Sequence, residues 1–155
     1  MIRKYTNGYY TETREIYLRL YKETGLSDQK KVEDYNEYIS RIRSLAYKGN
    51  ANAQYDLAQH YEDTGYFGIP NPFFNSTKRF YWYSKASNNN HAAAYNQLGY
   101  LIEHNEDNQK DLTKALDCYR KSMELGDDLG KKNYKKMLRD LKDGGIYNSG
   151  ANQNI

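Results

Sequence analysis

The sequence predicts an all-α protein, a short α-solenoid built from about seven helices in antiparallel hairpins. Apolar residues recur at three- and four-residue spacing through most of the 155 residues, which is the period of an amphipathic helix. The only prolines are Pro70 and Pro72, and no segment shows the alternation expected of a strand pair. Segments also repeat at offsets of 41 and 36 residues, and such self-similarity is typical of solenoid proteins.

Composition restricts the classes of function. The chain carries 23 Lys and Arg against 20 Asp and Glu, and a net charge of +3 does not by itself indicate a nucleic-acid or membrane partner. Cys118 is the only cysteine, so an intrachain disulfide and a cysteine-rich metal site are excluded. The 18 Tyr, beside 4 Phe and 1 Trp, predict a core built largely from amphipathic rings. Because no signal-peptide pattern and no run of about 18 apolar residues occurs, we expect a soluble, cytoplasmic protein.

The expected helices have recognisable starts and stops. Gly25 is a left-handed stop after the first helix. Either Ser27 or Asp28 caps the second helix, whose start could also lie as late as Asp34, and Val32 belongs to its apolar stripe. With their caps counted, the expected helices cover residues 11–23, 27–49, 52–62, 75–87, 92–103, 111–126 and 131–141.

Polar or proline-containing segments separate these helices. Residues 66–72 contain both prolines and are expected to form an irregular loop, and residues 104–109 a polar turn. The last residues are rich in Gly, Asn, Ser and Gln, which is too polar to pack against a core. We therefore expect residues 143–155 to be a disordered tail.

The repeat aligns side chains of the same kind. Leu57 pairs with Leu98 at 41 residues, and Tyr83 pairs with Tyr119 at 36 residues. The difference falls in the loop around Pro70, where an insertion leaves both helices in register. The capping candidates at equivalent positions are Asp34, Asn75 and Asp111. The small residues expected to let two helices approach closely are Ala51, Ala53, Ala58, Ala92, Ala94 and Gly99.

Two stretches of the chain follow one pattern. The first is Ala51-x-Ala53-Gln54-Tyr55-x-Leu57-Ala58-x-x-Tyr61 and, after a loop, Tyr81-Trp82-Tyr83-Ser84-Lys85-Ala86. The second runs from Ala92-x-Ala94 through Leu98-Gly99 to Asp111-x-x-Lys114-Ala115-Leu116-x-x-Tyr119-Arg120-Lys121-Ser122. These residues resemble the Sel1-like repeat (SLR) family, a relative of the tetratricopeptide repeat, and the resemblance implies a right-handed α-solenoid. It places full repeats at residues 51–90 and 92–127 and degenerate capping helices at residues 11–49 and 129–142, in a single domain over residues 1–142.

Few residues are candidates for catalysis. His60 follows Asp56 by four residues, a helical spacing at which a carboxylate can orient an imidazole. No nucleophile lies near that pair in the sequence, and Cys118 lies in no redox or protease motif, so we expect Cys118 to be a buried packing residue. The histidines show no metal-ligand spacing. We therefore predict that the protein is not an enzyme and uses no metal and no cofactor.

Binding is the remaining class of function. In tetratricopeptide-like solenoids the first helix of each hairpin lines the concave face, so the resemblance implies a partner-binding groove whose side chains are given by register. Tyr and Asn combine contact area with hydrogen bonding, as interface residues do. The expected partner-binding residues are Arg14, Asn52, Tyr55, Gln59, Glu62, Asn96, Tyr100, Glu103, Lys132, Lys136 and Arg139.

The helix expected over residues 131–141 is basic along one stripe. The stripe consists of Lys131, Lys135, Arg139 and Lys142, with Lys132 and Lys136 beside it. Such a face can meet phosphates or an acidic protein, and it is also what a solvated end helix of a solenoid looks like. Nucleic-acid binding therefore stays as a lesser alternative.

We predict a non-catalytic protein-protein interaction module, most specifically a cytoplasmic immunity or inhibitor protein that binds and neutralises a partner such as a toxin. The resemblance supports this, because small solitary members of this kind in bacteria and their viruses include such proteins. The alternatives are a regulatory adaptor or scaffold, and a phage-type factor that sequesters a host protein. A dimer is also compatible with so short a repeat array.

Overall fold

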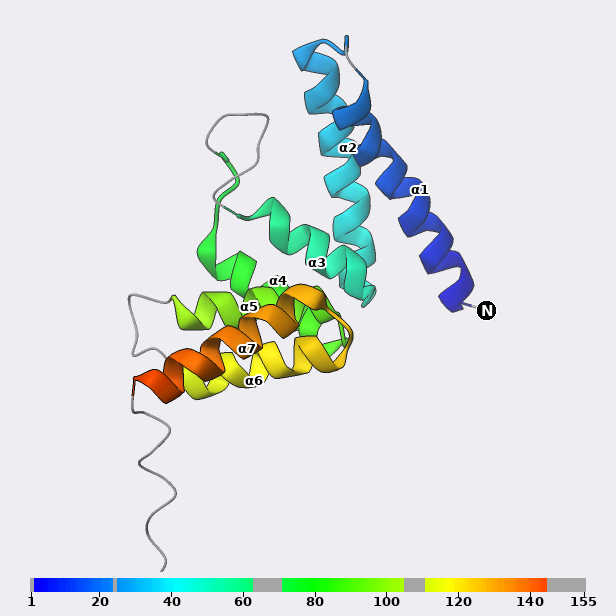
Figure 1. Ribbon diagram of the computed structural model, residues 1–155. Helices are drawn as coiled ribbons and strands as arrows, with labels where there is room; N and C mark the ends of the chain where they lie inside the picture. The colour runs from blue at the N-terminus through cyan, green and yellow to red at the C-terminus, as the bar shows by residue number, and fades with distance from the viewer. Residues whose placement is uncertain (1, 24, 63–70, 105–110, 145–155) are drawn as a thin grey trace, which may run out of the picture. The chain divides into compact units, whose positions relative to one another are not determined.

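The computed structural model describes residues 2–23, 25–62, 71–104 and 111–144, with side chains from Gly8 onward. This part of the chain is all-α, without strands, as the sequence predicts. Figure 1 shows its helices in chain order. They are α1 (Ile2–Lys22), α2 (Asp28–Tyr47), α3 (Ala51–His60), α4 (Ser76–Asn88), α5 (Ala92–Glu103), α6 (Leu112–Glu124) and α7 (Asp128–Asp143).

The helices group into two compact units, residues 1–89 and residues 90–155. In the first unit each helix packs on the next, from α1 to α4, and α1 and α2 lie side by side (Figure 1). In the second unit α6 packs on α5, and α7 packs on both. Consecutive helices therefore pack as hairpins, as expected. The predicted organisation as one domain over residues 1–142 stays a prediction.

Polar caps explain where most helices begin. Ser27, Asn75 and Asp111 each accept a hydrogen bond from the backbone N–H three residues later, at 3.2, 2.9 and 2.9 Å. These three predicted caps are confirmed. The prediction that Asp34 is a cap is wrong, because it lies inside α2 with its carboxylate 2.7 Å from Lys30 Nζ.

Two helices are longer than predicted. Helix α1 begins at Ile2 rather than at residue 11 and continues through Gly8, where the cost of a helical glycine is offset by tertiary contacts such as the one Tyr10 makes with Asp56. Helix α7 begins at Asp128 rather than at residue 131, because Asp127 caps it by accepting from the Gly130 N–H at 2.8 Å. The expected loop, polar turn and tail fall largely on residues 63–70, 105–110 and 145–155, which lie outside the described residues.

Small residues lie where helices approach closely. Ala53, Ala58 and Ala94 are fully buried, as predicted, whereas Ala51 and Ala92 are half-buried. A Cβ on Gly99 would lie 2.9 Å from Cε1 of Tyr119 and 3.2 Å from the backbone oxygen of Ala115. Gly99 is therefore a point of close contact between α5 and α6.

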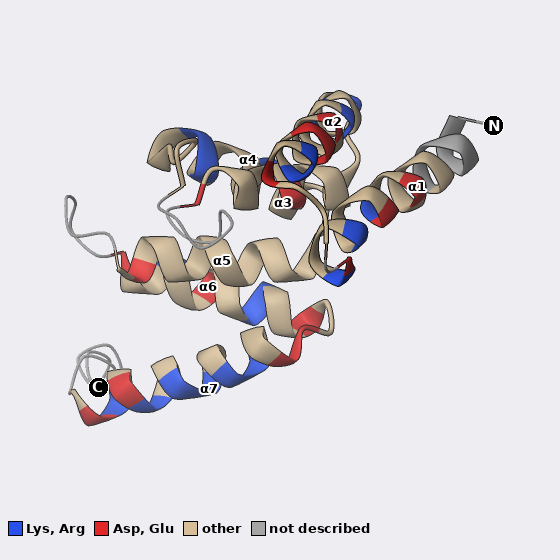
Figure 2. Cartoon of the chain, turned by 90° about the horizontal axis from the view of Figure 1, so that it is seen from above, with Lys and Arg blue, Asp and Glu red and all other residues tan. Residues whose placement is uncertain are grey.

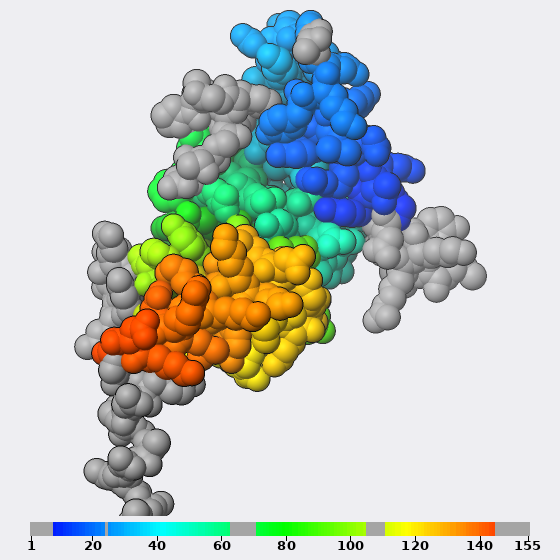
Figure 3. All heavy atoms as spheres, viewed as in Figure 1, coloured from blue at the N-terminus to red at the C-terminus, as the bar shows by residue number. Residues whose placement is uncertain are grey.

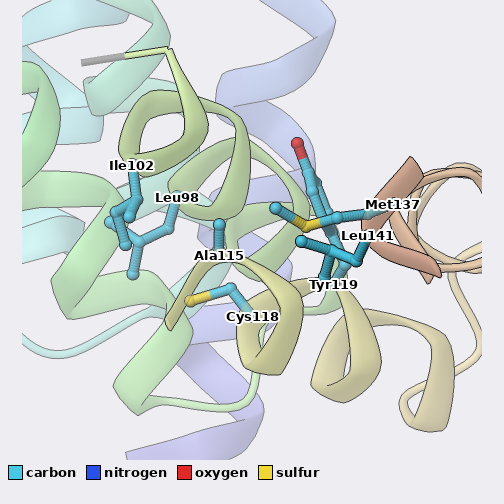
Figure 4. Close-up of a cluster of buried hydrophobic side chains, with 7 residues drawn as sticks. All are labelled: Leu98, Ile102, Ala115, Cys118, Tyr119, Met137 and Leu141. Atoms are coloured by element: carbon cyan, nitrogen blue, oxygen red, sulfur yellow. The ribbon is translucent and has the colours of Figure 1, made fainter. Parts of the chain in front are cut away.

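The core of the second unit is apolar. Figure 4 shows Leu98 and Ile102 from α5 together with Ala115, Cys118 and Tyr119 from α6, and Met137 and Leu141 from α7. Cys118 is a buried packing residue, as expected, and burial raises the pKa of its thiol. In the first unit the core placement of Val32 is wrong, since its side chain is 42% exposed.

Candidate functional site

The first unit contains a pocket of about 180 Å³, here called the tyrosine pocket. Four tyrosines from α1 and α2 surround it, and polar side chains of α3 complete it. Its lining residues are Arg14, Tyr17, Tyr21, Tyr35, Tyr38, Ile39, Asp56, Gln59, His60, Glu62 and Asn71.

A buried carboxylate joins three helices at this pocket. Oδ2 of Asp56 accepts hydrogen bonds from the hydroxyl of Tyr10 at 2.9 Å and from that of Tyr38 at 3.0 Å, and Arg14 Nη1 lies 3.5 Å away. Burial raises the pKa of the Asp56 carboxyl, while Arg14 and the two hydroxyl donors act in the opposite direction. Since these donors come from α1 and α2, the carboxylate ties both helices to α3.

His60 does not pair with Asp56, contrary to the interpretation of their spacing. Its Nδ1 lies 2.8 Å from the hydroxyl of Tyr35, and its ring packs against Phe73 with centroids 4.7 Å apart. Burial lowers the pKa of the imidazole to about 4, and the charges of Arg43 and Lys78 lower it further in the same direction. Among the described residues, the side-chain partner of the His60 ring is therefore the Tyr35 hydroxyl and not the Asp56 carboxylate that the spacing suggested.

The second unit contains a pocket of about 220 Å³ between α5, α6 and α7, here called the α5–α7 pocket. The Tyr100 ring stacks on His104 with centroids 4.2 Å apart, and Tyr119 donates to Glu103 at 2.6 Å. The amide of Asn133 donates to the side chain of Asn96 at 2.8 Å. The described residues that line it are Tyr100, Glu103, His104, Tyr119, Asn133, Lys136 and Met137.

The two pockets gather six of the eleven predicted partner-binding residues. Arg14, Gln59 and Glu62 line the tyrosine pocket. The corresponding residues of the α5–α7 pocket are Tyr100, Glu103 and Lys136. The partner-binding role of all of them stays a prediction.

The other five predicted residues lie elsewhere. Asn52, Lys132 and Arg139 are exposed outside both pockets. Tyr55 packs its ring on Tyr83 with centroids 5.5 Å apart, and Asn96 is buried. Register therefore led to helices that line the two pockets, whereas the depth of each side chain depended on its neighbours.

Sequence reasoning missed a third hollow, here called the α2–α4 groove. It measures about 450 Å³ and lies within the first unit. Its lining residues are Arg43, Tyr47, Leu57, Tyr61, Lys78, Tyr81 and Trp82. A signal was present in the sequence, because residues 80–83 are four consecutive aromatics between basic residues.

The basic face of α7 is exposed as predicted. Figure 2 shows Lys and Arg spaced along the helix, and Lys131, Lys135 and Arg139 are all exposed. In the space-filling view (Figure 3) the atoms of α7 lie against those of α6. Lys136 is the one cation of this helix with an ion pair among the described residues, at 2.9 Å from Asp140.

Two further properties concern metals and membranes. Across residues 2–23, 25–62, 71–104 and 111–144, no three His, Cys, Asp or Glu side chains are grouped as a metal ion would need. Within the same ranges, no helix combines the length and apolar character required to cross a bilayer.

The hairpins, buried alanines and close helix contacts define a helical-repeat protein of the α-solenoid class. Comparison with solved structures finds two proteins with a similar repeat fold. The match to a Sel1 repeat protein from Oxalobacter formigenes has 31% sequence identity and a TM-score of 0.54, and it covers 63% of this chain and 37% of that one. A second match is to a protective antigen present in uropathogenic Escherichia coli strains that displays an SLR fold, with 28% identity and a TM-score of 0.53, covering 74% of this chain and 21% of that one.

These two structures confirm the predicted resemblance, and the chain has the Sel1-like repeat fold. The matches span 37% and 21% of the lengths of the two structures, well under two thirds. No protein-family profile matches the chain, and no curated protein matches it. A fold of this kind suggests a protein-protein interaction module.

Proposed function

We propose that this chain is a non-catalytic protein-binding module that acts in the cytoplasm as an immunity or inhibitor protein, binding and neutralising a partner protein such as a toxin. The observation that carries the proposal is the shared design of the two pockets. In each unit the first helix of the repeat hairpin, α3 or α5, contributes polar and charged side chains to a hollow that also contains tyrosine rings. Tyrosine offers large contact area and a hydrogen bond at low entropic cost, which suits recognition of a protein surface.

The state of the titratable groups supports a role without catalysis. Asp56 accepts from two tyrosine hydroxyls and is paired with Arg14, Glu103 accepts from Tyr119, and His60 is engaged by Tyr35. Cys118 is buried in the apolar core, away from both pockets. A base or nucleophile needs a proton acceptor or sulfur that can reach a substrate, and these groups are already used for structure.

One observation favours a second candidate, nucleic-acid binding through α7. Lys131, Lys135, Arg139 and Lys142 follow one another at helical spacing and have no ion pair among the described residues. A phosphate backbone would be attracted to such a face. That candidate predicts a steep loss of affinity with salt and a smaller salt slope after Lys132→Ala plus Lys136→Ala.

The test is recovery of a partner with the tagged chain from its native host. We expect one protein in near-stoichiometric amount, and we expect Gln59→Ala plus Tyr100→Ala to reduce its recovery, because both exposed side chains lie at the pockets. The matched control is Gln29→Ala plus Tyr9→Ala, which removes an exposed glutamine and a 39% exposed tyrosine outside both pockets. Retention of RNA or DNA with no protein partner would reject the proposal.

The inhibitor role is tested separately from binding. When the recovered partner is expressed alone and together with this chain, we expect the chain to suppress its activity or toxicity. A partner whose activity is unchanged in the complex would instead support the adaptor or scaffold alternative. A partner that proves to be a host protein captured by a phage-encoded chain would support the sequestering alternative.

A further inference from the structure

The α2–α4 groove combines a buried apolar floor with exposed aromatic side walls. Leu57, Tyr61 and Trp82 are at most 8% exposed and close the bottom. Tyr47 and Tyr81 are 73% and 48% exposed. Both rings lie 5.1 Å from the indole ring of Trp82 and nearly perpendicular to it, at 89° and 83°. Exposed aromatic area of this kind beside a buried apolar floor is typical of a site that receives a partner's apolar side chain.

The charged residues described in the groove lining are positive. Arg43 and Lys78 line it, and Lys78 Nζ stands over the Tyr61 ring at 5.2 Å from the centroid. Lys85 Nζ stands over the Tyr81 wall at 5.4 Å. None of the lining residues that the structure describes carries a carboxylate.

These cations are not paired with any carboxylate that the structure describes. Within the described ranges no carboxylate lies within ion-pair distance of Arg43, Lys78 or Lys85, whereas Arg41 on the same helix as Arg43 is paired with Glu37 at 2.6 Å. The positive field reaches inward, since Arg43 and Lys78 both act to lower the pKa of the buried His60. An unpaired cationic rim over an apolar floor is complementary to an acidic chain that also carries apolar side chains.

We propose that the α2–α4 groove binds an acidic segment of a partner protein, with an apolar side chain of that segment held between Tyr47, Tyr81 and Trp82 and its carboxylates paired with Arg43 and Lys78. The proposal rests on the proposed protein-binding function and names the chemistry of the partner. Guanidinium and carboxylate match in a two-point hydrogen-bonded geometry, so Arg43 can fix the register of the segment. Lys78 supplies a second, less directional charge.

The geometry favours a peptide over single-stranded nucleic acid. Base stacking needs ring faces presented in succession along a positive groove. Here each of the two exposed rings stands nearly perpendicular to the Trp82 indole. The described lining of the groove contains two cations, Arg43 and Lys78, too few to follow a phosphate backbone. A short segment with acidic and apolar side chains can contact the apolar floor, the exposed aromatic rings and the cations of the groove.

Trp82 is the only tryptophan, so its fluorescence reports on this groove alone. The probe is a capped Glu-Glu-Leu-Glu-Glu-Leu peptide, and its matched neutral probe is Gln-Gln-Leu-Gln-Gln-Leu. With the full chain we expect the acidic peptide to change the Trp82 emission and to bind at least about tenfold more tightly than the neutral one. The affinity should fall as salt is raised, because the ion pairs are exposed.

Variants test whether the cations of the groove, rather than the overall charge of the protein, determine the affinity for the acidic peptide. Arg43→Glu plus Lys78→Glu should lower the affinity for the acidic peptide by at least about tenfold. Arg19→Glu plus Lys114→Glu makes the same change of charge at two exposed cations that line none of the three hollows, and it should leave the affinity nearly unchanged. Arg43→Gln plus Lys78→Gln serves if the charge-reversed chain does not fold, as judged by its far-ultraviolet circular dichroism, and a loss of affinity is expected there as well.

Equal binding of the two peptides, unchanged affinity in the groove variants, or no change of Trp82 emission would overturn the proposal. A stronger response to an oligo(dT) strand than to the acidic peptide would also overturn it, in favour of nucleic acid. If the groove variants still recover the native partner while peptide binding fails, the groove assignment is wrong and the protein-binding function stands. If the acidic peptide binds and no protein partner is recovered, the proposed function fails and the groove assignment stands.

Discussion

The hairpins α3–α4 and α5–α6 share one hydrogen bond, in which a tyrosine of the second helix donates to a glutamate near the end of the first. Glu62 and Glu103 lie 41 residues apart near the ends of α3 and α5, and each accepts a hydrogen bond from a buried tyrosine of the following helix. These donors, Tyr83 and Tyr119, are 36 residues apart and each about 1% exposed. A hydroxyl that would be costly to bury alone is thereby satisfied at the same place in both repeats.

The two hairpins differ on the face that meets their neighbours. Asp56 and His60 of α3 are buried and hydrogen-bonded to tyrosines of α1 and α2, whereas the equivalent Gln97 and Leu101 of α5 are half-buried. In the second unit the apolar side chains of α7 complete the core instead (Figure 4). The repeat therefore defines the hairpin, and residues outside the repeat decide whether its face packs through a polar network or through apolar contacts.

The largest effect should come from breaking the polar network. Asp56→Ala leaves the hydroxyls of Tyr10 and Tyr38 without their acceptor and the guanidinium of Arg14 without its ion-pair partner. We expect a loss of about 3 kcal/mol in the free energy of unfolding. Hydrogen exchange should show the loss in α1–α3 and not in α5–α7. Gln97→Ala at the equivalent position should cost less than about 1 kcal/mol, and a similar loss in both variants would contradict the comparison.

Exchanging the small residues of the two hairpins tests their close contacts. In Gly99→Ala the new methyl group meets the buried Tyr119 ring and the backbone oxygen of Ala115, neither of which can move aside cheaply. We expect a net loss of about 1 to 2 kcal/mol by denaturant unfolding, despite the better helix propensity of alanine. Ala58→Gly should cost about 1 kcal/mol through propensity and a small void. A gain in stability for Gly99→Ala would show that the α5–α6 contact is looser than it appears in the structure.

Acidification should weaken the first unit through His60. Its pKa is lowered to about 4 from an ordinary 6.5, so the unfolded chain takes up a proton at higher pH than the folded one does. Stability is therefore complete above pH 6.5 and falls as the pH drops toward 4, by roughly 1 to 2 kcal/mol.

His60→Leu, which copies Leu101 of the other hairpin, tests the source of this pH dependence. The slope between pH 6.5 and 4 should become smaller, although the variant loses the bond to Tyr35. His91 caps α5, and its pKa is also lowered by burial, so His91→Asn is the control for the second unit. An unchanged slope in His60→Leu would assign the pH dependence to other groups.

The smallest effects should come from the equivalent caps. Asn75→Ala and Asp111→Ala each remove one acceptor from a helix N-terminus, and each should lower the free energy of unfolding by about 1 kcal/mol. Since the two caps accept the same kind of backbone hydrogen bond at equivalent helix starts, thermal denaturation should show similar losses of stability. A marked difference would mean that one of the helix starts is held by tertiary contacts instead.

Local chemistry and the repeat determined much of this protein from the sequence alone. The bounds of α5, the caps Ser27, Asn75 and Asp111, and the close contact at Gly99 follow from capping preferences, helical period and self-similarity, which depend on residues near each other in the chain.

Only the tertiary structure decided the partners of the buried polar groups. Asp56 receives Tyr10 from 46 residues away and His60 receives Tyr35 from 25 residues away, so their spacing within α3 suggested a pair that does not form. The grouping of Arg43, Lys78 and Trp82 in one groove likewise required α2 and α4 to be brought to α3. A carboxylate or cation takes the nearest partner in space, and that distance is fixed by packing between helices and not by position along the chain.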